Sequence, residues 1–269
     1  MRHPLDKVYL GTNTKMFMTA AEAKTYIDRL LVLTKDIRDE INLFVIPSFT
    51  SLATVKGATD GTGIMVGAQN MGWEERGQYT GEISPLMLKE LCVDLVMAGH
   101  SERRHVFRET DKDEEKKVVC AAQHGLKVLL CVGETARQKE YGVSKETLRT
   151  QLMVGLHSLS KEYAEQFLWI AYEPVWAIGV NGLPASEAYA EEMHQCIKSA
   201  LCELYGERTG LMVPVLYGGS VNNDNAEAFM KQPHIDGLFI GRSAWDADNF
   251  NHIIRSIMPV FKRHKGLRI

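Results

Sequence analysis

The chain has 269 residues, enough for one large α/β domain or two smaller ones with a substantial core. Its hydrophobic fraction of 45% and charged fraction of 24% are ordinary for a soluble globular protein. A net charge of −3 argues against nucleic acid or an acidic membrane surface as the main partner.

Short apolar runs of the β type alternate along the chain with longer helical stretches. The runs are near-continuously hydrophobic, which is typical of parallel strands with both faces covered. Eight of them are predicted strands: 8–11, 43–46, 64–68, 95–98, 128–132, 168–172, 213–217 and 237–240.

Helix start signals stand between these runs. Thr19 can cap a helix that reaches Leu33, with Glu22 at the capping-box position. Further helix starts are predicted at Thr110, at Ser186 (for a helix through Leu204), and at Asp246 or Asp248.

The repeating βα order predicts the fold class. Eight βα repeats without an evident linker favour a (β/α)₈ TIM barrel, an α/β fold, with residues 1–269 as a single domain. A doubly wound open sheet is the alternative, but no G-x-G-x-x-G motif follows the first strand.

Two acid–base residues stand where predicted strands end. His100 follows the run 95–98 and Glu173 follows 168–172, both in glycine-containing segments. Parallel α/β proteins keep their active sites at the carboxyl ends of strands. A lone histidine there is more often structural, but two such residues favour a catalytic pair.

The residues around these two refine the expectation. Ser101 can cap a short helix with Glu102 in its first turn, and a helix N-terminus keeps a facing imidazole neutral. After the first strand, Asn13 and Lys15 share one direction and Thr14 takes the other. Lys15 is then a fixed charge in the barrel mouth or, alternatively, a surface lysine.

The segment after Glu173 is a candidate lid. A carboxylate flanked by Tyr172 and Pro174 is partly desolvated, which suits a general base. Residues 174–184 contain Trp176, Gly179 and Gly182 and are predicted to cover the site, with an ordinary βα loop as the alternative.

Glycine-containing turns follow the last two predicted strands. Tyr-Gly-Gly-Ser-Val spans 217–221 and Ile-Gly-Arg-Ser spans 240–243. Phosphate sites of barrels commonly lie after strands 7 and 8, where glycines let backbone N–H groups approach an anion. The sequence therefore predicts phosphate binding at these turns.

Together these residues fit proton abstraction beside the carbonyl group of a phosphorylated sugar, through an enediolate. We expect no metal site, because the remaining histidines are scattered and form no triad, and we expect no cofactor. The G-x-S-x-G motif of a serine nucleophile is also absent. The histidines without a predicted role include His105, His124, His157, His194 and His234.

The motifs Asn-x-Lys, AGHSERR, AYEPVWAIG and YGGSV, in this order, resemble the triosephosphate isomerase family over nearly the whole chain. The resemblance implies Glu173 as the proton-shuttling base, His100 as a neutral donor to the enediolate oxygens and Lys15 as the compensating cation. We take this mechanism over from the family, for which it is well known, and do not derive it from the residue pattern. The remaining implied roles are site orientation for Asn13 and Glu102, and phosphate contacts for Gly179, Ser220 and Gly241.

The resemblance also implies the assembly. Family members are homodimers in which the third loop enters the neighbouring site, and here residues 69–82 look like that loop. Thr80 would stand at its tip, and Glu82 would be available to pair with Arg103 across the interface.

The chain departs from the family pattern at several positions. Thr14 stands where tryptophan is usual, Phe239 where a smaller aliphatic is usual, and the lid residues Val180-Asn181-Gly182-Leu183-Pro184 are one residue longer than expected. Arg242 replaces a second glycine; its guanidinium can reach the substrate phosphate or, alternatively, pair with Asp246.

These departures, with PHIDGLFIGRSAW and YTGEISPLMLK, resemble more closely the branch that converts L-erythrulose 1-phosphate to D-erythrulose 4-phosphate. Triosephosphate isomerisation is the alternative. A Schiff-base aldolase using Lys15 and a non-catalytic barrel are two further possibilities. The first predicts a covalent adduct on Lys15, and the second predicts an eroded site.

The cysteine pattern bears on the cellular compartment. The five cysteines show no C-x-x-C spacing, and the first ten residues do not form a secretory leader. No apolar run approaches the roughly 20 residues of a membrane span. We therefore expect reduced thiols, a cytoplasmic location and no membrane partner.

Overall fold

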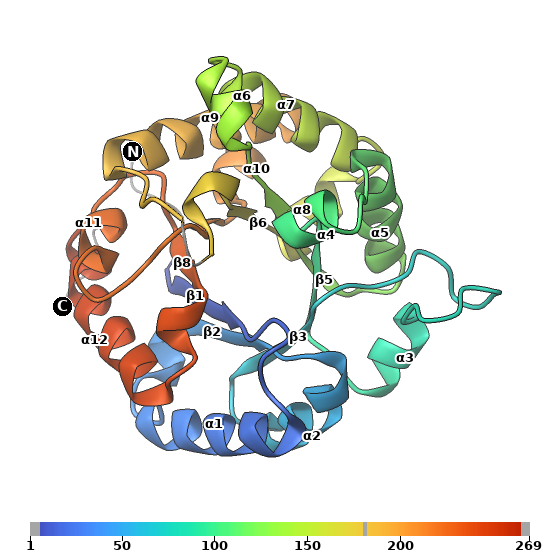
Figure 1. The fold of residues 1–269 in the computed structure, drawn as a ribbon, viewed down its shortest axis with the longest axis vertical. Helices are drawn as coiled ribbons and strands as arrows, with labels where there is room; N and C mark the ends of the chain where they lie inside the picture. The colour runs from blue at the N-terminus through green and yellow to red at the C-terminus, as the bar shows by residue number, and fades with distance from the viewer. Residues whose placement is uncertain (1–5, 180–181, 265–269) are drawn as a thin grey trace.

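The eight strands form a closed parallel barrel in a computed structural model that describes residues 6–179 and 182–264. β1 pairs with β8, with Tyr9 opposite Gly237, which closes the ring. The predicted (β/α)₈ barrel is confirmed, and the helices surround the strands (Figure 1). The strands are β1 (Val8–Asn13), β2 (Ile41–Ile46), β3 (Met65–Ala68), β4 (Leu95–Ala98), β5 (Lys127–Val132), β6 (Leu168–Tyr172), β7 (Val215–Tyr217) and β8 (Gly237–Ile240).

The predicted strands agree with the structure except at some of their first or last residues. β4, β6 and β8 have the predicted bounds, whereas β7 begins at Val215 and not at 213. Pro214 has no N–H to donate to a strand ladder, so the regular pairing starts after it. β1 continues to Asn13, which makes that residue the last one of the strand.

The helices α1 and α5 begin with the predicted capping residues. The side chains of Thr19 and Thr110 each accept a backbone N–H three residues later and form capping boxes with Glu22 and Asp113. The α-helices are α1 (Ala20–Leu33), α2 (Phe49–Thr59), α3 (Pro85–Glu90), α4 (Ser101–His105), α5 (Asp111–Gln123), α6 (Ala136–Glu140), α7 (Ser144–Gly155), α8 (Lys161–Phe167), α9 (Glu187–Tyr205), α10 (Glu207–Met212), α11 (Ala226–Met230) and α12 (Ala247–His264). Short 3₁₀ helices are η1 (Arg38–Glu40), η2 (Val175–Ala177) and η3 (Arg242–Ala244).

The other two predicted helix starts are also confirmed. The Ser186 side chain accepts the Tyr189 N–H at the start of α9. Asp246 Oδ1 accepts the Asn249 N–H at 2.8 Å, so of the two aspartates Asp246 caps α12. Among the described residues, no helix combines the length and apolar character that a membrane crossing requires.

The barrel interior is filled by a separate cluster of large side chains. The Phe44 and Phe239 rings stack with centroids 5.8 Å apart, and Trp169 packs against Phe44 at 5.5 Å. Gly11 makes this possible, since a Cβ there would come within 2.1 Å of Phe44 Cζ. Phe239 is 4% exposed and therefore forms a rigid floor beneath the carboxyl ends of the strands.

A buried histidine lies in the layer between the barrel and the helices. His194 on α9 is fully buried, with its ring centroid 5.7 Å from that of Tyr172. Its Nδ1 lies 3.2 Å from the carbonyl oxygen of His234, whereas Nε2 has no hydrogen-bond partner among the described residues. Burial lowers the pKa of His194 to about 4, although Asp236 opposes this effect.

Candidate active site

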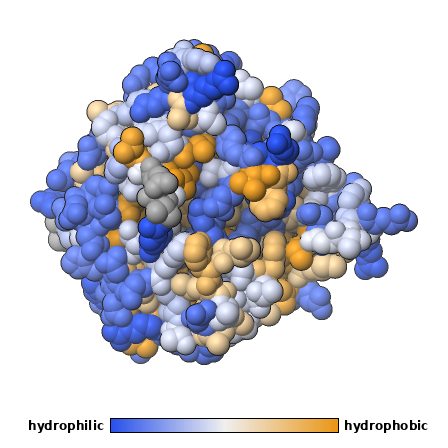
Figure 2. Space-filling view, in the orientation of Figure 1, coloured by the Kyte–Doolittle hydropathy of each residue, from blue (hydrophilic) through white to orange (hydrophobic). Residues whose placement is uncertain are grey.

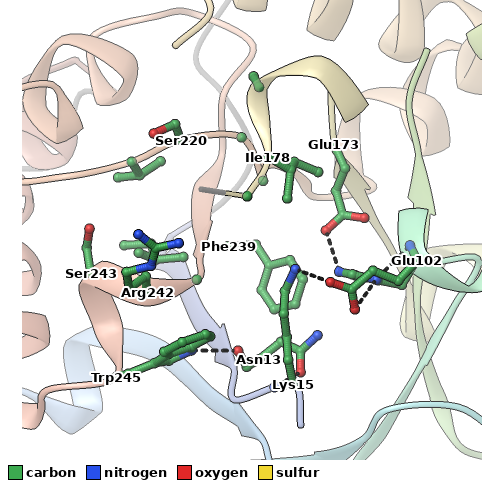
Figure 3. Close-up of a pocket in the computed structure, with 18 of the residues that line it drawn as sticks. Asn13, Lys15, Glu102, Glu173, Ile178, Ser220, Phe239, Arg242, Ser243 and Trp245 are labelled. Atoms are coloured by element: carbon green, nitrogen blue, oxygen red, sulfur yellow. Dashed lines mark hydrogen bonds and ion pairs between the residues drawn. The ribbon is translucent and has the colours of Figure 1, made fainter. Parts of the chain in front are cut away.

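The predicted site residues line one pocket of about 380 Å³ at the carboxyl ends of the strands (Figure 3). A pocket of this size suits a small molecule. Glu173 and Glu102 lie on one side of it, and Ser220, Ser243 and Arg242 lie on the other (Figure 3). All nine residues predicted from the sequence contribute to the lining: Asn13, Lys15, His100, Glu102, Glu173, Gly179, Ser220, Gly241 and Arg242.

The end of β1 holds Asn13 and Lys15 in fixed positions. Asn13 Oδ1 accepts the Lys15 N–H at 2.8 Å and the Gln69 side-chain amide at 3.0 Å. Lys15 has a φ of 51°, a left-handed conformation that is rare for a residue with a side chain. Thr14 is 1% exposed and is absent from the pocket lining, so the predicted alternation of directions is confirmed.

Lys15 is paired within the pocket. Its Nζ lies 2.7 Å from Glu102 Oε1, on the first turn of α4. The lysine side chain is 17% exposed and the glutamate side chain 48% exposed. The Lys15 ammonium group therefore already has a carboxylate partner on α4 in the unliganded pocket.

His100 has a different local role from the one expected. The prediction that Ser101 caps α4 is wrong. His100 itself is the N-cap, and its Nδ1 accepts the Glu102 N–H at 3.2 Å. A ring nitrogen can accept there because it occupies the place of a capping oxygen. Since Nδ1 accepts, the proton of the neutral ring is on Nε2, which faces Glu173 Oε1 at 3.4 Å.

Glu173 is 3% exposed at the end of β6, with its carboxylate aimed at α4. Oε2 accepts the Ser101 N–H at 3.2 Å. The glycines that follow β5 and β7 lie so close to Glu173 that neither position has room for a side chain. A Cβ on Gly133 would lie 1.8 Å from the Glu173 carbonyl oxygen, and one on Gly218 would lie 2.9 Å from its Cγ.

A buried carboxylate that the sequence analysis missed fastens the segment after Glu173. Glu134 Oε1 accepts the Trp176 indole N–H at 2.8 Å and the Tyr189 hydroxyl at 2.9 Å. The Tyr172 hydroxyl donates to the same carboxylate at 3.0 Å. Glu134 comes two residues after the end of β5, and Glu173 comes one residue after the end of β6, so its place just past a strand was the available signal.

Part of the predicted lid can be located. Gly179 has a φ of 89° and lines the pocket, and the Lys139 Nζ lies 3.4 Å from the centroid of the Trp176 ring. Val180 and Asn181 lie outside the described residues. Closure of this segment stays a prediction.

The turn after β7 offers free backbone donors. Gly218 N–H donates to the Tyr172 carbonyl at 2.7 Å, which ties the turn to β6. Within the described part of the chain, the N–H groups of Gly219 and Ser220 have no hydrogen-bond acceptor. Unpaired N–H groups at a pocket wall can bind an oxyanion.

Two aromatic residues complete the wall beside β8 and were not predicted. The Trp245 indole N–H donates to the Asn13 carbonyl at 2.9 Å, and its ring lies 4.5 Å from that of Phe17. Both line the pocket.

Asp246, the alternative partner of Arg242, is not paired with it, because no ion pair between them exists among the described residues.

The residues 69–82 project from the ring of helices between β3 and α3 (Figure 1). The expected partner of Glu82 is already engaged, since Arg103 Nη2 lies 2.5 Å from Glu109 Oε1 of its own chain. Glu109 also accepts from Asn70 at 3.2 Å and lies 2.6 Å from Lys117. Arg103 therefore supports the base of this loop from within the chain.

Known proteins resemble this chain over nearly its whole length. The chain is 45% identical over 256 residues to L-erythrulose-1-phosphate isomerase of Rhizobium etli, covering 95% of this chain and 94% of the relative. The proteins of the same name from Rhizobium meliloti and Mesorhizobium japonicum are both 46% identical, covering 93% and 91% of this chain and 96% and 95% of the relatives. The profile described as triosephosphate isomerase matches residues 8–257. The resemblance predicted from the motifs is thereby confirmed, and the chain belongs to the triosephosphate isomerase family.

Proposed function

We propose that this protein is a phosphosugar isomerase that converts L-erythrulose 1-phosphate to D-erythrulose 4-phosphate. The observation that carries the proposal is the meeting of Glu173, His100 and Lys15 in one pocket, opposite a turn with unpaired N–H groups. The names of the relatives favour the tetrulose phosphate over the triose phosphate.

The reaction needs one proton transfer between adjacent carbons. Glu173 removes the proton from C3, the electron pair forms the enediolate across C2 and C3, and the same carboxyl group returns the proton to C2. His100 Nε2–H donates to the two oxygens in turn, which moves the carbonyl group from C2 to C3. Numbering from the opposite end then gives the 4-phosphate.

The other pocket residues hold the charges. Lys15 lies next to the reacting oxygens and stabilises the negative charge of the enediolate, and Glu102 and Asn13 keep the lysine in place. The backbone N–H groups at Gly179, Ser220 and Gly241 bind the phosphate, which keeps the reacting carbons next to Glu173.

Proton NMR of the purified protein in D₂O tests the substrate. We expect L-erythrulose 1-phosphate to be converted with deuterium incorporation at carbon, at a kcat/KM at least about tenfold above that for dihydroxyacetone phosphate. An apolar increment such as one methylene is worth only about 1–3 kcal/mol in discrimination between substrates, so slow conversion of the triose phosphate is compatible with this proposal. Fast conversion of dihydroxyacetone phosphate alone would make the protein a triosephosphate isomerase.

We also propose that the protein acts as a homodimer through residues 69–82. Hydrophobic side chains surround the hollow at the barrel mouth (Figure 2). After β1 and α4, Met16 is 93% exposed, Phe17 and Val106 are each 67% exposed, and Phe107 is 61% exposed. Such exposed apolar surface is typical of an interface. Sedimentation velocity should give about twice the 30.2 kDa of the chain, and a monomer at micromolar concentration would contradict the dimer.

The five cysteines are all unpaired in the structure. Free thiols persist in a reducing compartment, so we place the enzyme in the cytosol. The phosphorylated substrate agrees with this location, because phosphosugars are made and used inside cells.

A further inference from the structure

We propose that the Arg242 side chain is a phosphate-binding residue of this pocket, in addition to the backbone N–H groups of the glycine turns. The inference rests on the proposed function only in taking the ligand to be a phosphate ester. It assigns a side-chain cation to a turn where the family usually has glycine.

The first observation is the position of Arg242. It opens η3 directly after Gly241, lines the pocket and is exposed to solvent there. Its guanidinium lies on the same side of the pocket as Ser220 and on the side opposite Glu173 (Figure 3). The side chain is therefore at the end of the pocket where the Ser220 N–H group is free, away from the reacting carbons.

The second observation is that Arg242 has no counter-charge. Among residues 6–179 and 182–264, no carboxylate lies within ion-pair distance of its guanidinium. The two aspartates that follow it are used elsewhere: Asp246 caps α12, and Asp248 lies 2.5 Å from Arg29. Its guanidinium donors are therefore free to bind an anion in the pocket, with no carboxylate of the chain to compete for them.

The third observation is the distribution of charge in the pocket. Its charged lining residues are Lys15, Glu102, Glu173 and Arg242. Lys15 is already paired with Glu102 at 2.7 Å, so Arg242 is the cation of this lining that remains to balance a phosphate dianion. A guanidinium can also donate two parallel hydrogen bonds to phosphate oxygens, which a backbone N–H cannot do.

Inorganic phosphate is the probe that tests this, by isothermal titration calorimetry on the wild-type protein and on Arg242→Gln and Arg242→Lys. Charge-assisted hydrogen bonds of this kind predict a phosphate affinity about 10- to 100-fold weaker in Arg242→Gln. Arg242→Lys should fall between the two, because it keeps the charge and loses the bidentate geometry. The KM for L-erythrulose 1-phosphate should rise in Arg242→Gln by a similar factor, with kcat changed less.

The matched control is Arg29→Gln, which removes the same charge from the outer surface of α1. It should bind phosphate like the wild-type protein, and melting curves should show that the pocket variants remain folded. Unchanged phosphate affinity in Arg242→Gln would overturn the inference. The proposed function fails separately: a wild-type protein that binds phosphate through Arg242 but leaves L-erythrulose 1-phosphate unchanged refutes the isomerase and keeps the phosphate residue.

Discussion

Glu173→Gln should lower kcat by about 10²- to 10⁴-fold, the usual contribution of a positioned general base. The amide has nearly the same shape and can still accept the Ser101 N–H, but it cannot take a proton from carbon. Phosphosugar binding should stay within a few fold of wild type, because the turn after β7 and Arg242 are untouched. Stopped conversion and absent deuterium exchange in D₂O, together with calorimetric binding, would separate these two effects.

The matched control is Glu146→Gln, an exposed glutamate on α7 that lies away from the pocket lining. Its turnover should equal that of the wild-type protein. A Glu173→Gln variant that exchanges substrate hydrogen at a near-normal rate would remove Glu173 from the role of base. Another group of the pocket would then have to carry the proton.

The buried His194 should make the protein less stable as the pH falls. Its pKa of about 4 lies below the ordinary value near 6.5, so the unfolded chain binds the proton more readily than the folded one. The stabilising contribution is complete above about pH 6.5 and is lost as the pH falls through about 4. The loss approaches about 3 kcal/mol, because each pKa unit corresponds to about 1.4 kcal/mol.

His194→Asn tests this, because asparagine can still donate to the His234 carbonyl and cannot be protonated. Urea unfolding between pH 4 and pH 7.5 should show a shallower fall for this variant than for the wild-type protein. His252→Asn, which alters an exposed histidine on α12, should keep the wild-type slope. Equal slopes for His194→Asn and the wild-type protein would mean that other groups cause the acid sensitivity.

The barrel and the site were predictable from the sequence for one physical reason. Strands buried on both faces are continuous apolar runs, and the first polar residue after such a run stands at the carboxyl end of the strand. In a closed parallel barrel all these ends meet at one face, so Asn13, His100 and Glu173 had to converge.

What escaped prediction depends on contacts between distant segments. His100 caps α4 with a ring nitrogen, a role that serine or aspartate usually takes, so the sequence favoured Ser101. The aromatic wall formed by Phe17 and Trp245 joins residues from opposite ends of the chain. Whether Arg242 had an acidic neighbour could be decided only from the position of Asp246 in space.

The Glu134 carboxylate has a consequence for how this pocket can change in evolution. It holds Trp176, which comes shortly after Glu173, and Tyr189, which lies at the start of α9. Both flanks of the intervening segment are thus pinned to the end of β5, whatever residues lie between them. The length and composition of the segment between Trp176 and Tyr189 can therefore change without moving Glu173. This makes the segment a suitable place for related enzymes to acquire new substrates.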